Sequence, residues 1–226
     1  MDFFLNYIRR LTLLLIIYTS SRVYFYLSNI DSLEKTSVLE FIEGCRFDIS
    51  ALAYINIPLF ILLIFPTNLR TKNGFRILTN LLFYSVNIPF ILINNVDIEY
   101  FKFTQKRSTI DLIQLLQLGE DARNIIPQYM KEHWVLSLFS IIQIWFILKI
   151  KNIPETTIKS GYKSIVKSIL IFIIGSGFTI LGARGGFQLK PINAINAGEL
   201  SNSENTALIL NTPFCILNAL DEKKLK

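Results

Sequence analysis

The chain has 226 residues, of which 51% are hydrophobic and 18% charged, and its formal net charge is +6. Soluble domains carry about 25% charged residues, and here the charges are missing from long apolar blocks, which indicates a membrane protein. Abundant Phe, Ile and Leu exclude a disordered chain, and only two cysteines exclude a disulfide scaffold. The basic residues cluster in short segments between apolar blocks, so the positive charge does not indicate nucleic-acid binding.

Five apolar blocks follow one another along the chain, at residues 11–27, 49–65, 77–96, 134–150 and 165–181. A helix needs about 20 mostly apolar residues to cross the hydrocarbon core of a bilayer, and each block reaches or approaches that length. We therefore predict an all-α membrane protein with five transmembrane helices, kinked at Pro58 and Pro89. The alternative, a soluble protein with five buried helices, would normally show a polar stripe at the helical period, and such residues are sparse here.

Basic residues gather before the first block, between the second and third, and between the fourth and fifth. Positive charge marks cytoplasmic segments, so the pattern predicts a cytoplasmic N-terminus and, after five crossings, an extracytoplasmic C-terminus. Residues 1–183 then form the transmembrane domain and 184–226 an extracytoplasmic linker. Because Pro191, Pro213 and repeated Asn disfavour a long helix, the linker is predicted to be mostly irregular and mobile. The basic residues concerned are Arg9, Arg10, Arg70, Lys72, Arg76, Lys149, Lys151, Lys159, Lys163 and Lys167.

The predicted outer face contains one amphipathic stretch, residues 108–118, with the sequence STIDLIQLLQL. Ser108 and Asp111 form a capping-box-like start, and the leucines that follow share one side of a helix. The stretch is therefore predicted to be a short helix, either lying in the membrane interface or packed on the core of a soluble domain.

Charged and aromatic residues stand close to the predicted outer ends of the blocks. Arg46 and Asp48, where the second block begins, either cap and orient that helix or line a polar headgroup site. Asp97 and Arg107, after the third block, either pair with other side chains or meet a lipid phosphate. Tyr100 suits the headgroup zone, where amphipathic rings settle.

Other reactive groups are few. His133 is the only histidine, and no Cys or His cluster has metal-ligand spacing, so no metal site is expected. Cys45 and Cys215 both fall on the predicted outer face, and whether they form a disulfide stays open. Residues 182–186, GARGG, lack the Lys-Ser/Thr of a phosphate-binding loop and are interpreted as a flexible exit from the fifth block. Arg22 lies toward the end of the first block and is expected to snorkel to the interface.

Four outer-face motifs follow one another in a characteristic order. GCRFDISA (44–51) leads into the second block, and DIEYFKF (97–103), followed by KRST (106–109), comes after the third. RGGFQLKPIN (184–193) follows the fifth block, and NTPF (211–214) closes the pattern. This order resembles the membrane portion of the lipoteichoic acid synthase family, which includes the related bacterial phosphoglycerol transferases.

The resemblance implies a cytoplasmic-membrane protein whose five transmembrane helices and juxtamembrane linker precede a large extracellular sulfatase-like domain of the alkaline phosphatase superfamily. That domain transfers glycerol phosphate from phosphatidylglycerol, or a related phosphoryl group, with a Thr nucleophile beside Mn²⁺ or Mg²⁺. This chain reaches Lys226 before that domain would begin. The resemblance therefore implies a membrane anchor that is inactive alone and holds no cofactor itself.

On this interpretation the partners are membrane lipids with phosphatidylglycerol-like headgroups and the missing catalytic domain, with no nucleic acid. The carboxylates are expected to orient helices or dock the domain, and the arginines to hold phosphate through paired hydrogen bonds. The alternative is a stand-alone small polytopic membrane protein with a scaffold or lipid-handling role. The candidate substrate-binding or domain-docking residues are Arg46, Asp48, Asp97, Tyr100, Arg107, Arg184 and Gln188.

Overall fold

The computed structural model describes the whole chain except residues 1, 65–71, 112–126, 151–161, 201–204 and 225–226. The regular structure of the described residues is entirely helical, with no strand among them, as the composition predicted. The elements are α1 (Asp2–Ser28), a short 3₁₀ turn (Ile30–Ser32), α2 (Val38–Ile55), α3 (Ile57–Ile64), α4 (Asn73–Thr104), α7 (Trp134–Lys149), α8 (Tyr162–Arg184), α9 (Ala194–Leu200), α10 (Thr206–Ile209) and α11 (Thr212–Lys224).

Three of these helices, α1, α4 and α8, are long and apolar enough to cross a membrane. The pair α2 and α3 passes the same test when its two members are taken together, although they are bent by 65° at a short break. Helix α7 covers the fourth apolar block but has only 16 residues. The part of the chain that the structure describes is thus all-helical, with three to four candidate membrane-spanning helices.

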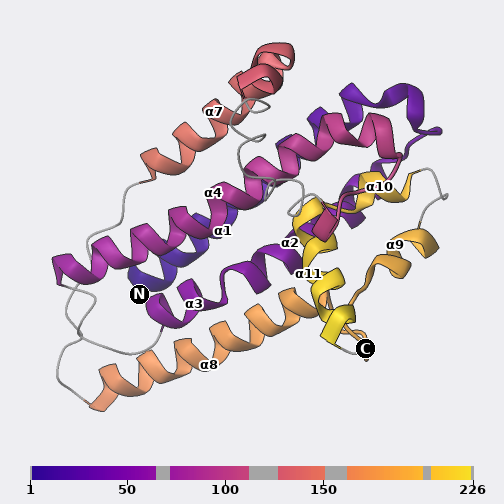
Figure 1. The fold of residues 1–226 in the computed structure, drawn as a ribbon. Coiled ribbons are helices and arrows are strands. Elements are labelled where there is room, and N and C mark those ends of the chain that lie inside the picture. The colour runs from indigo at the N-terminus through magenta and orange to yellow at the C-terminus, as the bar shows by residue number, and fades with distance from the viewer. Residues whose placement is uncertain (1, 65–71, 112–126, 151–161, 201–204, 225–226) are drawn as a thin grey trace.

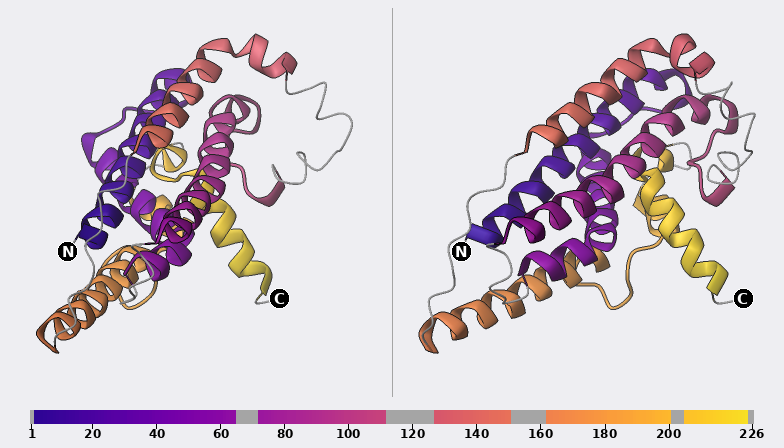
Figure 2. Two further views of the ribbon diagram at one scale, coloured as in Figure 1. Left: turned by 90° about the vertical axis from the view of Figure 1, so that its left-hand side faces the viewer. Right: turned by 60° about the vertical axis from the view of Figure 1, so that its left-hand side comes forward.

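The long helices form an elongated bundle in which α1, α4 and α8 run in the same direction (Figures 1 and 2). Helix α1 packs on α2, α3 and α4, while α8 packs on α2 and α3 and α7 packs on α4. The C-terminal helices α9, α10 and α11 gather at the end of the bundle where α1, α4 and α8 finish. We call this the distal end, and the end where α4 and α8 begin the proximal end.

The break between α2 and α3 confirms the kink predicted at Pro58. Proline has no N–H to donate to the carbonyl four residues earlier, so the helix cannot continue straight through it. At the bend, the Asn56 side chain donates to the carbonyl of Leu52 over 3.0 Å and exchanges two amide hydrogen bonds of 2.8 and 3.0 Å with Asn87 of α4. In contrast, α4 continues through Pro89 as one helix.

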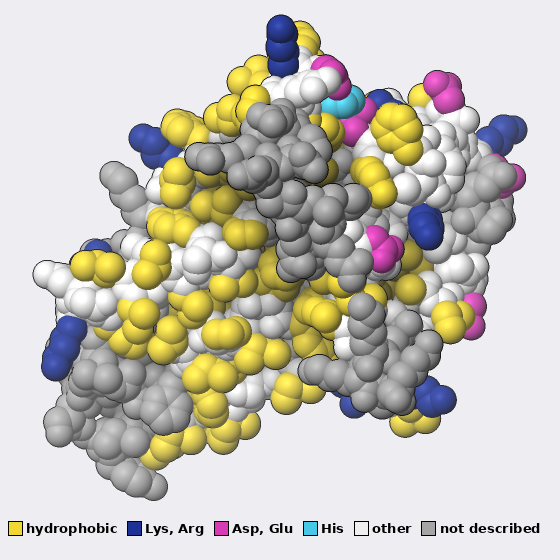
Figure 3. Space-filling model, in the orientation of Figure 1, with side chains coloured by type: hydrophobic (Ala, Val, Ile, Leu, Met, Phe, Trp, Pro, Cys, Tyr) yellow, Lys and Arg dark blue, Asp and Glu magenta, His cyan; other side chains and the backbone are white. Residues whose placement is uncertain are grey.

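On the face of the bundle seen in Figure 3, apolar side chains predominate between the two ends, where few charged side chains are visible. On α7 and α8, large side chains such as Trp145, Phe146, Ile173 and Phe178 are each more than half exposed. Water-soluble monomers do not expose continuous apolar surface of this extent. Buried amides hold the helices together, as where Asn95 donates to Gln143 over 2.8 Å.

The prediction that the linker is mostly irregular is wrong, because three helices, α9 to α11, lie within residues 184–226. Pro213 does not prevent α11, since it occupies the first turn, where the missing N–H has no helical partner in any case. The predicted mobility of this linker is also wrong for part of it, because Asn205, Leu208, Ile209 and Thr212 are each completely buried against the bundle.

Candidate functional site

Residues 205–216, which we call the docked segment, insert into the distal end of the bundle. This segment comprises α10 and the start of α11, which contact α1, α2 and α4. The sequence alternates apolar residues, which enter the core beside Phe47, with Asn and Thr side chains that meet two buried carboxylates. The candidate functional site is therefore a buried polar contact between the bundle and its own C-terminal segment.

The first carboxylate is Asp48 of α2, whose side chain has no exposure. It forms an ion pair with Arg22 of α1 and accepts a hydrogen bond of 2.7 Å from the Asn211 amide of the docked segment. The Arg22 guanidinium also donates to the carbonyls of Gly44 over 2.9 Å and of Ile209 over 2.7 Å. Arg22 thus joins two helices to the docked segment, and the expectation that it snorkels to the interface is wrong.

Gly44 gives the Arg22 guanidinium the room that it occupies. A Cβ atom at position 44 would lie 2.5 Å from the Arg22 Cζ atom, which is closer than any ordinary contact. Since the guanidinium is held by several acceptors, it cannot move aside without losing them. This explains a glycine in the middle of a helix, where that residue is otherwise unfavourable.

The second carboxylate is Asp97 of α4, which is also completely buried. It pairs with Arg107 over 3.2 Å, accepts the Ser108 N–H over 3.0 Å and the Ser108 hydroxyl, and accepts the Thr212 hydroxyl of the docked segment over 2.6 Å. The Arg107 Nε atom donates to the carbonyl of Ala207 over 2.8 Å, and its guanidinium lies 3.6 Å from the ring centre of Phe25.

These contacts correct the expected capping pair of the amphipathic stretch. Ser108 is engaged with Asp97, and it is the neighbouring Thr109 hydroxyl that bonds to Asp111, over 3.2 Å. Ser108 bonds to Asp97 because a hydrogen bond to a buried carboxylate is stronger than a capping bond at a solvent-exposed helix start. Most of the predicted interfacial helix, residues 112–118, lies outside the described residues.

Burial shifts the pKa of two groups beside or within the docked segment, Arg107 and Cys215. Burial lowers the pKa of the Arg107 guanidinium from its usual range, and the adjacent Asp97 carboxylate opposes that shift. Burial also raises the pKa of the Cys215 thiol to about 12. Cys215 is therefore a protonated, packed thiol, and neither it nor Cys45 forms a disulfide in the structure.

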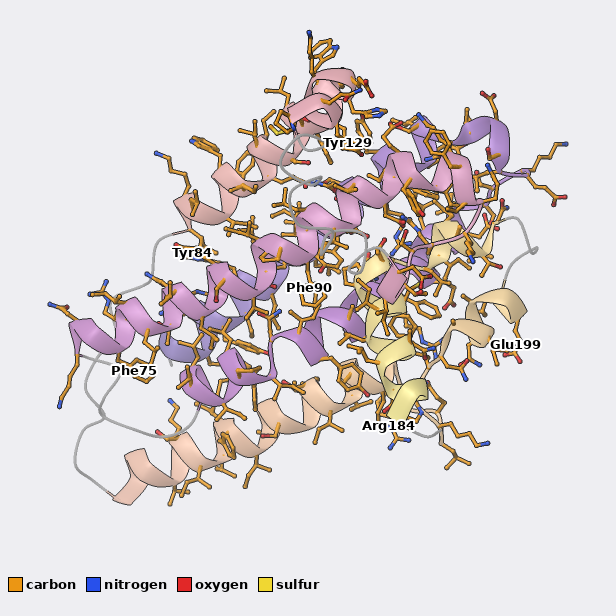
Figure 4. All side chains as sticks on the ribbon, viewed as in Figure 1. Phe75, Tyr84, Phe90, Tyr129, Arg184 and Glu199 are labelled. Atoms are coloured by element: carbon orange, nitrogen blue, oxygen red, sulfur yellow. The ribbon has the colours of Figure 1, made fainter. Side chains whose placement is uncertain are left out.

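A second polar cluster lies where α8 ends. Arg46 of α2 donates to the carbonyl of Gly185 and, over 2.8 Å, to the side-chain oxygen of Gln188. Arg184 donates to the backbone carbonyls of Gln188 over 2.8 Å and of Leu189 over 2.6 Å. Figure 4 labels Arg184 where α8 finishes, far from Phe75 at the proximal end.

The turn in this cluster needs its two glycines. Gly185 and Gly186 have φ angles of 72° and 133°, in the region that glycine adopts at little cost. A Cβ atom at Gly185 would also clash with the Ile192 side chain, 2.5 Å away. Since both arginines hold this turn, it is a defined loop, and the interpretation of residues 182–186 as a flexible exit is wrong.

The structure thus divides the candidate residues from the sequence into two clusters. Asp48, Asp97 and Arg107 surround the docked segment. Arg46, Arg184 and Gln188 hold the loop after α8, whereas Tyr100 is half-buried on α4 and belongs to neither cluster.

Sequence reasoning missed the main partners of the two carboxylates. Arg22, Asn211 and Thr212 were not among the candidates, although each contacts Asp48 or Asp97. Arg22 itself could have indicated a buried ion pair, because a charged residue inside an apolar helix normally faces a buried partner.

The described residues contain no group of three His, Cys, Asp or Glu side chains that could hold a metal ion. His133 lies 3.4 Å from Glu99, outside both clusters. The donors and acceptors around the docked segment are largely used in holding the chain, so the arrangement binds a peptide segment. Comparisons of the chain with models of protein families, with curated proteins and with solved structures find no match.

Proposed function

We propose that this chain is the membrane anchor of an extracytoplasmic phosphotransferase that resembles the lipoteichoic acid synthases, with its distal end on the outer face of a bacterial cytoplasmic membrane. The observation that supports this proposal best is the buried attachment of the docked segment. Two ion pairs, Arg22–Asp48 and Arg107–Asp97, are completed by side chains of that segment. A chain held in this way emerges from the bundle at a fixed place and direction.

In this proposal all five apolar segments cross the bilayer. The 16 residues of α7 span about 24 Å at 1.5 Å per residue. This is shorter than the typical hydrocarbon core of about 30 Å, so the proposal requires the bilayer to thin locally around α7. Lys72, Arg76 and Lys149 belong to the proximal end, where α4 begins and α7 finishes. That end is accordingly cytoplasmic by the positive-inside rule.

The anchor contributes position, and the catalytic domain contributes the chemistry. A sulfatase-like domain following α11 would supply the threonine nucleophile and the ligands for Mn²⁺ or Mg²⁺. The anchor would keep that active site close to lipid headgroups, which raises the effective concentration of substrate. Lipids with phosphatidylglycerol-like headgroups and the catalytic domain are thus the proposed partners.

The DNA that follows codon 226 tests this proposal. We expect the same frame, or one directly adjacent, to encode a sulfatase-like domain with its threonine and its Asp, Glu and His metal ligands. Downstream sequence unrelated to such a domain would contradict the anchor and favour a stand-alone membrane protein with a scaffold or lipid-handling role.

A further inference from the structure

The loop that follows α8 turns two large apolar side chains away from the protein. Phe187 and Leu189 are 92% and 97% exposed, so each makes almost no contact with the rest of the described chain. Gln188, which lies between them, is half-buried and accepts a hydrogen bond of 2.8 Å from Arg46. The loop thus keeps its polar side chain on the protein and presents its apolar side chains outward, which is the reverse of the arrangement that water favours.

Hydrogen bonds within the loop fix this outward arrangement. The Arg184 guanidinium donates to the carbonyls of Gln188 over 2.8 Å and of Leu189 over 2.6 Å. The N–H of Ile192 donates to the carbonyl of Arg184 over 3.1 Å. The loop therefore folds back onto the last residue of α8, and its apolar side chains stay at the level where that helix ends.

The length of α8 sets the depth of this loop in a bilayer. Its apolar stretch Val166–Arg184 has 19 residues, which span about 28 Å at 1.5 Å per residue. The hydrocarbon core of a bilayer is about 30 Å thick, so Arg184 lies near the edge of the core when the helix crosses it. In the membrane placement proposed above, Phe187 and Leu189 then lie at the outer boundary between acyl chains and headgroups.

The loop also lies to the side of the bundle, where a bilayer would surround it. In the right-hand view of Figure 2 it hangs from the side of the bundle beside the end of α8 and does not continue along the bundle axis. The part of α8 that leads to it is apolar outside, since Ile174, Phe178 and Ile180 are each more than half exposed. A loop that leaves a lipid-facing helix sideways at this depth meets lipid, whereas one that projected along the axis would meet water.

We infer that residues 185–190, which we call the anchor loop, insert Phe187 and Leu189 into the outer leaflet where the acyl chains meet the headgroups. The partner is the lipid surface itself, with no selection of a headgroup, because two apolar side chains make the contact. The long side chain of Lys190 can carry its ammonium group to the water side at this depth. The inference rests on the membrane placement in the proposed function, but it does not depend on a phosphotransferase domain.

Insertion of the anchor loop would fix the path of the chain after α8. Helix α9 begins at Ala194, soon after the loop returns to the end of α8, and it leads to the docked segment. The chain is then held at two places, by the leaflet at the anchor loop and by the bundle at the docked segment. The anchor loop thus keeps the start of the C-terminal helices at the membrane surface.

Quenching of tryptophan fluorescence by brominated lipids, in nanodiscs of neutral phosphatidylcholine, tests this insertion. Phe187→Trp and Leu189→Trp are introduced one at a time into the full chain, whose two natural tryptophans, Trp134 and Trp145, are replaced by Phe. Both probes replace large exposed side chains, so they leave the packing of the bundle unchanged. We expect bromine near the headgroup end of the acyl chains to reduce the emission of each probe about twofold, and bromine near the methyl end to reduce it less.

Lys35→Trp in the same background is the control. Lys35 is exposed in the turn that precedes α2, at the distal end of the bundle, so brominated lipid should leave its replacement unquenched. Iodide, a quencher that stays in water, should act in the opposite order, strongly at position 35 and weakly at positions 187 and 189.

Bromine quenching at both loop positions, with none at position 35, supports the inference. Loop probes that iodide quenches as strongly as the control would place the anchor loop in water and overturn it. Protection from both quenchers would also overturn it, because another protein surface or a second copy of the chain would then cover the loop. A chain that does not enter nanodiscs would overturn the membrane placement as well, whereas none of these results bears on the DNA downstream of codon 226.

Discussion

Asp48→Ala is expected to destabilise the protein by about 3–5 kcal/mol, because it leaves the buried Arg22 guanidinium without its counter-charge. It also removes the acceptor of the Asn211 amide. The free energy of unfolding can be measured in mixed micelles by circular dichroism.

Two further variants test whether the loss of stability in Asp48→Ala comes from the unpaired Arg22 charge. Glu43→Ala removes a partly exposed carboxylate of the same helix, which pairs with Arg46 over 3.4 Å, and should cost less than about 1 kcal/mol. Replacing both members of the buried pair, Arg22→Met with Asp48→Leu, should recover much of the loss, because no unpaired charge then remains. Equal effects of Asp48→Ala and Glu43→Ala would show that the ion pair does not hold the bundle together.

Asp97→Ala is expected to release the docked segment without unfolding the bundle. The change removes the acceptor of Arg107, Ser108 and Thr212 together, so a local loss of about 3–4 kcal/mol is expected. Hydrogen exchange of residues 205–216 should accelerate by about 10²–10³-fold, while exchange in the middle of α1 and α4 should change little.

Glu99→Gln is the matched control on the same helix. Glu99 pairs with the part-exposed Lys102 over 2.8 Å and with His133 and does not contact the docked segment. Its substitution should leave exchange in residues 205–216 unchanged. Uniform acceleration over the whole chain in Asp97→Ala would instead mean that the docked segment and the bundle unfold as one unit.

The sequence predicted the long helices well, because continuous apolar runs leave few other structures for the backbone. All five apolar blocks correspond to helices, with α2 and α3 sharing one block, and Pro58 marks the bend between those two. The roles of charged residues at the ends of the apolar blocks were harder to predict than the helices. Asp48 could be assigned to helix orientation or to a headgroup, and only the fold shows Arg22 beside it.

The docked segment was missed for a related reason. Its apolar runs, Ala207 to Leu210 and Phe214 to Leu217, are too short to indicate a helix by periodicity, and Pro213 between them indicates a loop. What fixes the segment is its contact with residues more than 100 positions away, such as Thr212 with Asp97. Long-range pairing of this kind leaves no local pattern in a single sequence.

Cysteine accessibility in intact cells tests most directly whether the chain crosses the membrane with its distal end outside. In a background of Cys45→Ser and Cys215→Ser, single replacements Lys35→Cys, Lys190→Cys and Lys72→Cys would be exposed to a membrane-impermeant maleimide. All three lysines are exposed in the structure, the first two at the distal end and the third at the proximal end. We predict labelling of positions 35 and 190 in intact cells and of position 72 only after permeabilisation. Equal labelling of positions 72 and 190 in intact cells would contradict the account.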